Sequence, residues 1–534
     1  MSMMTFERRQ ILSGLAASSA LLPRLSAAAT PAASPVARTR HGPVRGYLDN
    51  GVAVFKGVRY GADTGPRRFM PPLAPRPWTE IKDATAYGPA SPQRARGGEA
   101  ISEDCLFLNV WTPSLSEGAL RDGRKRPVMV YIHGGAYSTG SGSSPLYDGV
   151  RLCRRGDVVV VTLNHRLNAF GYAYLARLGG ADLAESGNAG QLDLVLALQW
   201  VRDNIATFGG DPGCVMVFGQ SGGGAKIATL MAMPSAAGLF HRAATMSGQQ
   251  VTASGPGNAT RRTEAWLDAL KLKPSDAEAL RTLPAERLLE GLKAEDPVLG
   301  FGGLYFGPVL DERTLTRHPF YPDAPPLSAR IPMIIGNVHD ETRAFMGGDE
   351  SNFTVGWDGL AAKLTPANLR VDIDPATVIA AYRRIYPAYS PSQVLFAATT
   401  ASRSWRAAVI EAEARARAGT PAFVYQLDWA TPKDGGKFGA PHASDIQLAF
   451  DNLDKPGATA IGPTAQPMAD QMSEAFLAFA RTGDPNTKAI PRWTPYTLPR
   501  RQTLVFNTPS RLVDDPRGAE RAFFAQIPFV QAGT

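Results

Sequence analysis

The chain has 534 residues, 44% of them hydrophobic and 19% charged, and a formal net charge of +8 at pH 7. This composition is ordinary for a soluble globular protein, and the length allows a core of considerable size. The arginines are scattered, without a basic block or a basic stripe laced with aromatic residues, which argues against a nucleic-acid partner. Metal-ligand spacings are absent, so we expect no metal.

The first 29 residues are predicted to be an export signal. Arg8 and Arg9 precede an apolar stretch over 11–22, and small residues over 26–29 supply a cleavage site. The apolar stretch is too short to span a membrane, and no later stretch approaches the roughly 18 apolar residues that a span needs. The paired arginines resemble a twin-arginine signal, with an ordinary secretory signal as the alternative. We therefore expect a bacterial protein that is periplasmic or secreted.

Between residues 127 and 250 the pattern alternates between strands and helices. Continuous apolar runs predict strands over 128–132, 158–163 and 215–218. Runs without alternation are typical of parallel strands covered on both faces. Apolar residues at spacings of four, three and four predict an amphipathic helix over 190–208. This order predicts a doubly wound α/β core.

The second half of the chain adds further elements. Residues 260–295 are helix-rich and are expected to lie beside or over the core. Runs over 333–336 and 422–428 predict two more core strands, each ending in a polar turn, and 468–483 predicts a late helix. Because neither an internal repeat nor a dividing linker is present, we expect residues 30–534 to form one domain.

A glycine-rich turn follows the third predicted strand, and two chemistries use such a layout. A phosphate-binding loop requires G-x-x-x-x-G-K and then Ser or Thr, but Ala225 stands where the lysine belongs and Ile227 follows Lys226. The motif G-x-S-x-G, which exposes a nucleophilic serine in a strand-to-helix turn, is matched in full by residues 219–223 and nowhere else. We interpret Ser221 as the nucleophile and Lys226 as a solvated residue of the next helix, with no assigned role.

A serine hydroxyl needs a base to accept its proton and an acid to orient that base. Around such an elbow the chain order is serine, then acid, then histidine. The turn after the strand at 333–336 offers Asp340 and Glu341. Of the seven histidines, only His442 lies beyond that turn. On its own His442 would be interpreted as a surface-loop residue, but the constellation favours a catalytic base.

The tetrahedral intermediate of acyl transfer needs N–H donors for its charged oxygen. Gly222 follows the candidate nucleophile and supplies one donor. The stretch HGGAY, over 133–137, follows the first predicted strand, where the second part of such a site belongs. A plain tight turn is the alternative interpretation of HGGAY.

These motifs and several longer ones resemble the type-B carboxylesterase family, the cholinesterase-like branch of the α/β-hydrolases. Further segments of the resemblance are FKGVRYG, SEDCLFLNVWTP, NHRLNAFGY, GNAGQLDLVLALQWVRDNIATFGGDP and FARTGDPN. The resemblance implies an α/β-hydrolase fold, with a mostly parallel central sheet, helices on both faces and helical insertions over the active site. It also implies a serine ester hydrolase that forms an acyl-enzyme, takes small-molecule esters and needs no cofactor. A non-catalytic cholinesterase-like binding module is the alternative.

By position, the resemblance also assigns individual roles. It selects Glu341 over Asp340 as the acid of the triad. It makes Gly135, Ala136 and Gly222 the donors of the oxyanion hole. Ala136 replaces a glycine of the family pattern but keeps its N–H.

Other matched positions concern structure. Arg68 and Glu103 match a structural ion pair of the family. Cys105 matches one half of a family disulfide, but Ser91 occupies the partner position, so we expect Cys105 to be a free, buried thiol. Asp445 stands where a glutamate is common in the family, and its role stays open.

Four aromatic residues lie near the catalytic segments in the sequence and are candidates for the substrate pocket, with a place in the core as the alternative. They are Tyr137, Phe170, Tyr172 and Phe345. Cys153 and Cys214 lie in or beside apolar runs and are expected to be buried. The basic charge weakly favours acidic esters, and the sequence sets no further limit on the substrate.

Overall fold

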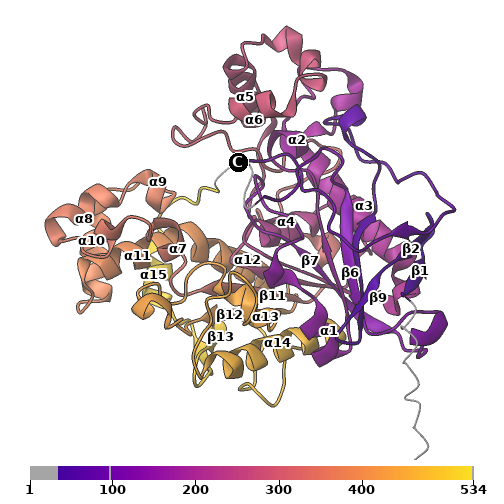
Figure 1. Cartoon of the computed structure of the whole chain (residues 1–534). Helices are drawn as coiled ribbons and strands as arrows, with labels where there is room; N and C mark the ends of the chain where they lie inside the picture. Colours follow the sequence, from indigo (N-terminus) through magenta and orange to yellow (C-terminus); the bar gives the residue numbers. More distant parts are fainter. Residues whose placement is uncertain (1–33, 95–97, 532–534) are drawn as a thin grey trace, which may run out of the picture. The chain divides into compact units, whose positions relative to one another are not determined.

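An eleven-stranded sheet forms the centre of the protein (Figure 1). The computed structural model describes residues 34–94 and 98–531, so the expected export signal at 1–29 lies outside the described residues. The order in the sheet is β14-β13-β12-β11-β10-β9-β7-β8-β6-β4-β3. Its strands are β3 (Tyr47–Asp49), β4 (Val52–Arg59), β6 (Phe107–Thr112), β7 (Arg126–Ile132), β8 (Val159–Leu163), β9 (Gly210–Gln220), β10 (Arg242–Met246), β11 (Met333–Val338), β12 (Ala422–Leu427), β13 (Gln502–Phe506) and β14 (Arg511–Asp514).

The strands from β8 to β13 are parallel, and antiparallel pairs form both edges. A separate three-stranded sheet joins β1 (Val36–Arg38), β2 (Pro43–Arg45) and β5 (Lys82–Asp83). The five predicted strands all belong to the parallel part, which confirms the doubly wound core.

Helices cover both faces of the sheet because its strands carry apolar side chains on both sides. One face packs against α3 (Ala189–Asn204), α4 (Gly222–Leu230) and α12 (Arg406–Arg417). The other face packs against α1 (Val150–Gly156), α13 (Ser444–Ala449) and α14 (Ala465–Thr482). The predicted helix over 190–208 is α3 followed by a single 3-10 turn, and the predicted late helix is α14. In the described part of the chain, no helix is both long enough and apolar enough to cross a membrane.

Two groups of helices lie outside these layers. The predicted helix-rich segment forms α5 (Pro256–Ala269) and α6 (Ala285–Gly291), which share a hydrophobic cluster with α2 (Asn168–Tyr172). The second group, between β11 and β12, was not predicted from the sequence. It contains α7 (Arg343–Met346), α8 (Trp357–Lys363), α9 (Pro366–Leu369), α10 (Pro375–Ile385) and α11 (Pro391–Thr400).

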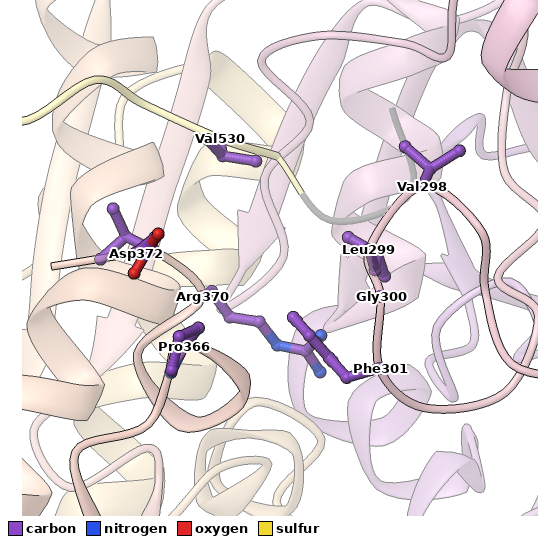
Figure 2. A pocket seen from close by; sticks show the side chains of 9 residues that line it. Val298, Leu299, Gly300, Phe301, Pro366, Arg370, Asp372 and Val530 are labelled. Atoms are coloured by element: carbon purple, nitrogen blue, oxygen red, sulfur yellow. The ribbon is translucent and has the colours of Figure 1, made fainter.

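A π-helical turn, Ala401–Trp405, joins α11 directly to α12. Helices α8 to α11 share a hydrophobic cluster of their own. The loop at 298–301 and the end of α9 line one cavity of about 430 Å³ (Figure 2). The second helix group and this loop therefore bound space that the sheet itself does not reach.

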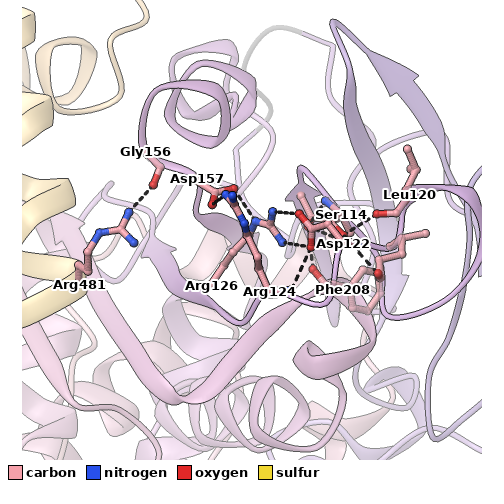
Figure 3. Close-up of polar contacts among 11 residues, drawn as sticks. Ser114, Leu120, Asp122, Arg124, Arg126, Gly156, Asp157, Phe208 and Arg481 are labelled. Carbon is pink, nitrogen blue, oxygen red and sulfur yellow. Dashed lines mark hydrogen bonds and ion pairs between the residues drawn. The ribbon is translucent and has the colours of Figure 1, made fainter.

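Polar contacts hold the elements together at the N-terminal end of β7 (Figure 3). Arg126 is buried, and it donates to Asp157 Oδ1 through Nε at 2.6 Å and to Asp122 Oδ1 through Nη1 at 3.1 Å. Arg481 of α14 donates to the carbonyl of Gly156 at 2.6 Å, which ties α14 to the end of α1. In such folds the opposite, C-terminal ends of the strands carry the ligand site.

Candidate active site

Ser221 stands in the sharp turn between β9 and α4. Its backbone angles are φ 56° and ψ −128°, a strained conformation for a residue with a side chain. A Cβ on Gly223 would lie 1.9 Å from the carbonyl oxygen of Ile132, and one on Gly219 would lie 2.6 Å from the same oxygen. Both outer glycines of the motif therefore allow the turn to pack against β7.

Glu341 and His442 are in contact. Glu341 follows β11, His442 lies in the turn after β12, and Nδ1 of His442 donates a short hydrogen bond to Glu341 Oε2. Glu341 Oε1 accepts from Asn337 Nδ2 at 3.1 Å and from the backbone N–H of Val338 at 3.2 Å. Burial alone would raise the pKa of Glu341, but the charge of His442 and these side-chain hydrogen bonds hold that pKa below its ordinary value. The carboxylate is therefore ionised at neutral pH.

Asp340, the other acid of the pair, is directed elsewhere. Its Oδ2 accepts from the backbone N–H of Ala440 at 3.1 Å, and its Oδ1 lies 3.0 Å from Nε of Arg343. Asp340 thus fixes the segment that leads into His442. The choice of Glu341 over Asp340, which the residues alone left open, agrees with this geometry.

The far nitrogen of His442 contacts Gln220. The two Nε2 atoms are 3.1 Å apart. Because Nδ1 of His442 carries the proton that faces Glu341, Nε2 is the acceptor and the Gln220 amide is the donor. Within the described part of the chain, no hydrogen bond joins Ser221 Oγ to His442, although both residues line the same cavity. Such catalytic contacts often form only when substrate is bound.

The three residues expected to form the oxyanion hole line that cavity too. Gly135 and Ala136 lie in the loop after β7 and both have positive φ, +89° and +53°. Gly222 begins α4, and a Cβ there would lie only 2.1 Å from the carbonyl oxygen of Ala136. The loop and the start of the helix are therefore in direct backbone contact.

The prediction that Lys226 is solvated is wrong. Its side chain is fully buried, and Nζ donates to the carbonyl of Ala136 at 2.8 Å and to that of His133 at 3.3 Å. Helical side chains lean toward the N-terminal end, which brings the ammonium group of Lys226 to this loop. Burial lowers the pKa of Lys226 to about 7. The lysine ties the nucleophile helix to the oxyanion loop.

Three of the four aromatic candidates for the pocket are core residues instead. Tyr137, Phe170 and Tyr172 are buried in the hydrophobic cluster that includes α5. The hydroxyl of Tyr137 donates to Gln250 Oε1 at 3.0 Å, and Tyr137 itself does not line the cavity. Only Phe345 lines the cavity, with its ring centroid 4.7 Å from that of His442.

The cavity above these groups has a volume of about 640 Å³, within the range of small-molecule sites. Side chains from later segments of the chain complete its lining. These include Tyr305, Phe345, Arg370, Arg403 and Phe529. Except for Phe345, sequence reasoning missed them, because no motif marks their positions.

Asp445 is buried close to Glu341 and His442. Its Oδ2 accepts from the hydroxyl of Tyr425 at 2.8 Å, and its Oδ1 has no partner among the described residues. Burial, together with the negative charge of Glu341, raises the pKa of Asp445 to about 6. No hydrogen bond joins Asp445 to a described triad residue, so it contributes to the surroundings of the triad rather than to its orientation.

The structural expectations from the resemblance are met. Arg68 donates to Glu103 through Nε at 2.7 Å, which confirms the ion pair. Cys105 is a free, buried thiol, as predicted. Cys214 is only half-buried, contrary to expectation, because it lies near the outer start of β9, with its sulfur 3.4 Å from Nη1 of Arg242.

Comparison with known proteins places this geometry in context. The profile of the carboxylesterase family matches residues 33–524. The chain is 35% identical over 502 residues to a para-nitrobenzyl esterase of Bacillus subtilis, covering 91% of this chain and 97% of that protein. It is also 35% identical over 521 residues to a phenmedipham hydrolase of Pseudarthrobacter oxydans, covering 91% and 96%.

Among solved structures, a carboxylesterase of Geobacillus stearothermophilus superposes with a TM-score of 0.80 at 39% identity, covering 91% of this chain and 99% of that one. A structure of a para-nitrobenzyl esterase superposes with a TM-score of 0.75 at 34% identity. These similarities confirm the predicted α/β-hydrolase fold.

Proposed function

Since this chain belongs to the carboxylesterase family and hydrolyses carboxylic esters, we propose that it does so through an acyl-enzyme on Ser221. One observation carries the proposal. The imidazole of His442 is held by the ionised, buried carboxylate of Glu341 and lines the same cavity as Ser221. An imidazole fixed in this way presents its unprotonated nitrogen to the cavity, as a general base must.

In the first step, Ser221 Oγ attacks the ester carbonyl while Nε2 of His442 takes the hydroxyl proton. Nε2 has a single lone pair, so the Gln220 amide has to release it when the hydroxyl approaches. Glu341 stabilises the imidazolium that forms and keeps the ring in its orientation.

The charge that develops on the carbonyl oxygen is stabilised by backbone N–H groups of Gly135, Ala136 and Gly222. Their positions depend on the close contact between the loop after β7 and the start of α4, which Lys226 reinforces. Preorganised donors need not move during the reaction, and each contributes about 2.7–4 kcal/mol to transition-state stabilisation in comparable sites.

The intermediate collapses when the bond to the alcohol oxygen breaks and His442 returns its proton to that oxygen. Water then attacks the acyl group on Ser221, with His442 again as the base. Acid product and free serine result, and the proton returns to the hydroxyl. No metal or organic cofactor takes part in these steps.

Replacement of Ser221 by Ala tests the mechanism. We expect kcat for a para-nitrophenyl ester to fall about 10⁴- to 10⁶-fold, because the members of such a triad act as a unit. Ser235→Ala, at an exposed position, is the control and should keep full activity. A fluorophosphonate should label the parent protein at Ser221 and leave Ser221→Ala unlabelled. A fully active Ser221→Ala protein, or a parent protein that does not react, contradicts the proposal; the latter result favours a non-catalytic binding module.

A further inference from the structure

Two arginines face the reactive cavity without an acidic partner. Arg370 follows α9 and Arg403 lies in the π-helical turn, and both line the cavity that contains Ser221. Among the described residues, no carboxylate lies within 4.0 Å of either guanidinium group, and no hydrogen-bond acceptor is paired with them. Their N–H donors are therefore free for a ligand.

Aromatic rings, rather than carboxylates, hold the two guanidinium groups. Figure 2 shows the side chain of Arg370 extending toward Phe301, with its guanidinium carbon 5.5 Å from the ring centroid. Asp372 lines the same neighbouring cavity, but it forms no ion pair with Arg370. The guanidinium carbon of Arg403 lies 4.4 Å from the ring centroid of Phe345. Stacking fixes the plane of a guanidinium group and leaves its edge available for hydrogen bonds.

The positive charges of Arg370 and Arg403 also repel each other. Burial, followed by the positive charge of Arg370, lowers the pKa of Arg403 to about 10, and burial lowers the pKa of Arg370. Because an arginine guanidinium is protonated in proteins at neutral pH, both groups are charged. Glu341 offsets part of this effect on Arg403 from a distance, but no described carboxylate contacts either group, and an anion bound between them would reduce the remaining repulsion.

Apart from Asp372, the described residues that line the two adjoining cavities are basic or uncharged. No described Asp or Glu side chain lines the reactive cavity, and Glu341 lies behind His442, to which it is bonded. An adjoining cavity, which shares Tyr305 with the first, is lined by Arg94 and Lys293 and likewise by no described acidic residue. A cleft lined by one sign of charge concentrates ligands of the opposite sign.

We propose that the preferred substrates are esters that carry a free carboxylate, which Arg370 and Arg403 bind while Ser221 attacks the ester carbonyl. This inference rests on the proposed function and specifies its substrate class. Arginine binds a carboxylate through paired N–H···O hydrogen bonds, which are among the stronger contacts in proteins. A neutral ester of the same shape leaves both guanidinium groups without a partner.

The spacing points to a short substrate. A single aromatic ring, that of Phe345, separates Arg403 from the catalytic imidazole, since it contacts both groups. The carboxylate therefore lies a few bonds from the ester group. Half-esters of small dicarboxylic acids fit this spacing, with the carboxylate on the acyl side, and so do esters of small hydroxy acids, with it on the alcohol side.

Matched pairs of substrates test the proposal. For the acyl side, the mono-para-nitrophenyl ester of glutaric acid is compared with the para-nitrophenyl ester of glutaramic acid. For the alcohol side, the acetate ester of meta-hydroxybenzoic acid is compared with that of meta-hydroxybenzamide. Each pair differs only by a carboxylate against an amide. We expect kcat/KM of the parent enzyme to be about 10- to 100-fold higher for the acid in at least one pair, the gain typical of charged hydrogen bonds.

Variants identify the groups responsible. In Arg370→Gln/Arg403→Gln the ratio of kcat/KM for the acid to kcat/KM for its amide partner should fall to about one, because Gln keeps polar contacts but carries no charge. Arg383→Gln is the control, since Arg383 is an exposed arginine stacked on Trp357 at 4.5 Å and does not line the cavity. It should keep the full preference.

Binding without turnover supplies a second readout. Calorimetry of Ser221→Ala with glutarate alone should show binding that is lost when Arg370 and Arg403 are also replaced by Gln. The inference is overturned if the parent enzyme hydrolyses the amide partners but prefers neither acid, or if the double variant keeps the preference. If the parent hydrolyses none of the four esters while glutarate binding still depends on both arginines, the proposed function fails and the anion site stands.

Discussion

The reactive cavity has one side made of backbone and one side made of side chains. The catalytic side consists of the turn at Ser221 and the loop after β7, at the C-terminal ends of parallel strands. The other side, as we define it, consists of side chains from the segments after β10 and β11, such as Tyr305, Phe345 and Arg403. In the proposed mechanism, the first side fixes where bonds form and break, and the second side determines which substrates bind.

The glycines of the two regions differ in how closely other atoms pack against them. On the catalytic side, a Cβ added at Gly248 would lie 1.6 Å from the carbonyl oxygen of Ser221, and one at Gly222 would lie 2.1 Å from that of Ala136. In the helices between β11 and β12, a Cβ at Gly348 or Gly356 would meet nothing within 4 Å. An added methyl group is therefore excluded at Gly222 and Gly248 and is accommodated at Gly348 and Gly356.

Of the substitutions predicted below, Gly222→Ala should cause the largest loss of activity. The new methyl group has to displace the oxyanion loop, so we expect kcat to fall about 10²- to 10³-fold, the cost of losing one oxyanion donor. Steady-state kinetics with a neutral para-nitrophenyl ester measures this fall. The matched variant is Gly356→Ala, which should keep the parental rate; equal losses in both variants would remove the distinction between the two sides.

Lys226→Met tests how the catalytic side accommodates a buried charge. The pKa of Lys226 is about 7 in the folded protein, against an ordinary value of 10.5. Between those values the unfolded chain binds a proton that the folded chain does not, so this group makes the folded state more stable as the pH rises. Relative to Lys226→Met, the parent should gain about 1–2 kcal/mol in the free energy of unfolding between about pH 7.5 and about pH 9.

Urea unfolding at the two pH values measures this gain. His133 and His165 face Lys226, and burial, followed by the charge of the lysine, lowers the pKa of both, that of His133 to about 3. Neither histidine therefore titrates in this range. The exposed Lys125, changed to Met, is the control and should show no pH-dependent difference. A parent-to-variant difference that stays constant with pH would mean that Lys226 keeps its proton throughout.

Phe345→Leu should have the smallest effect. The ring packs on His442 and under Arg403, and such aromatic contacts are worth about 0.5–1.5 kcal/mol. We expect kcat/KM for a neutral ester to fall only about two- to tenfold. Phe353→Leu, at a ring that packs against Phe396 in a tilted arrangement and does not line the cavity, should leave the kinetics unchanged. A loss as large as that of Gly222→Ala would show that the side-chain side also controls the chemistry.

The sequence predicts the backbone side well because its chemistry restricts residue types. A side chain at position 219, 222 or 223 would collide with the backbone, and only one histidine follows the acidic pair, so motif and order are sufficient. Lys226 was misjudged because lysines are rarely buried. The carbonyls that hold it belong to a loop about ninety residues earlier, a contact that no local pattern reveals.

Most residues of the side-chain side were not predicted from the sequence, for a related reason. Helices α7 to α11 are short, and short helices give a weak periodic signal. Arg370 and Arg403 belong to no motif, and without the fold they are two of many scattered arginines. Tyr137 was a candidate for the pocket but is a core residue. Its closeness in sequence to a catalytic loop does not determine the direction of its side chain.

The π-helical turn between α11 and α12 makes the charge of the cavity sensitive to chain length. Such a turn contains one residue more than an α-helical turn, and here that residue is absorbed beside Arg403. α11 packs among the inserted helices, whereas α12 packs against β11 and β12. Loss of one residue would merge the two helices and rotate one against the other by about 100°. If α12 keeps its place on the sheet, the turn that carries Arg403 swings away from the cavity. A single-codon deletion, rather than a substitution, is therefore an evolutionary route by which an enzyme with this same triad could change the charge of the substrates it accepts.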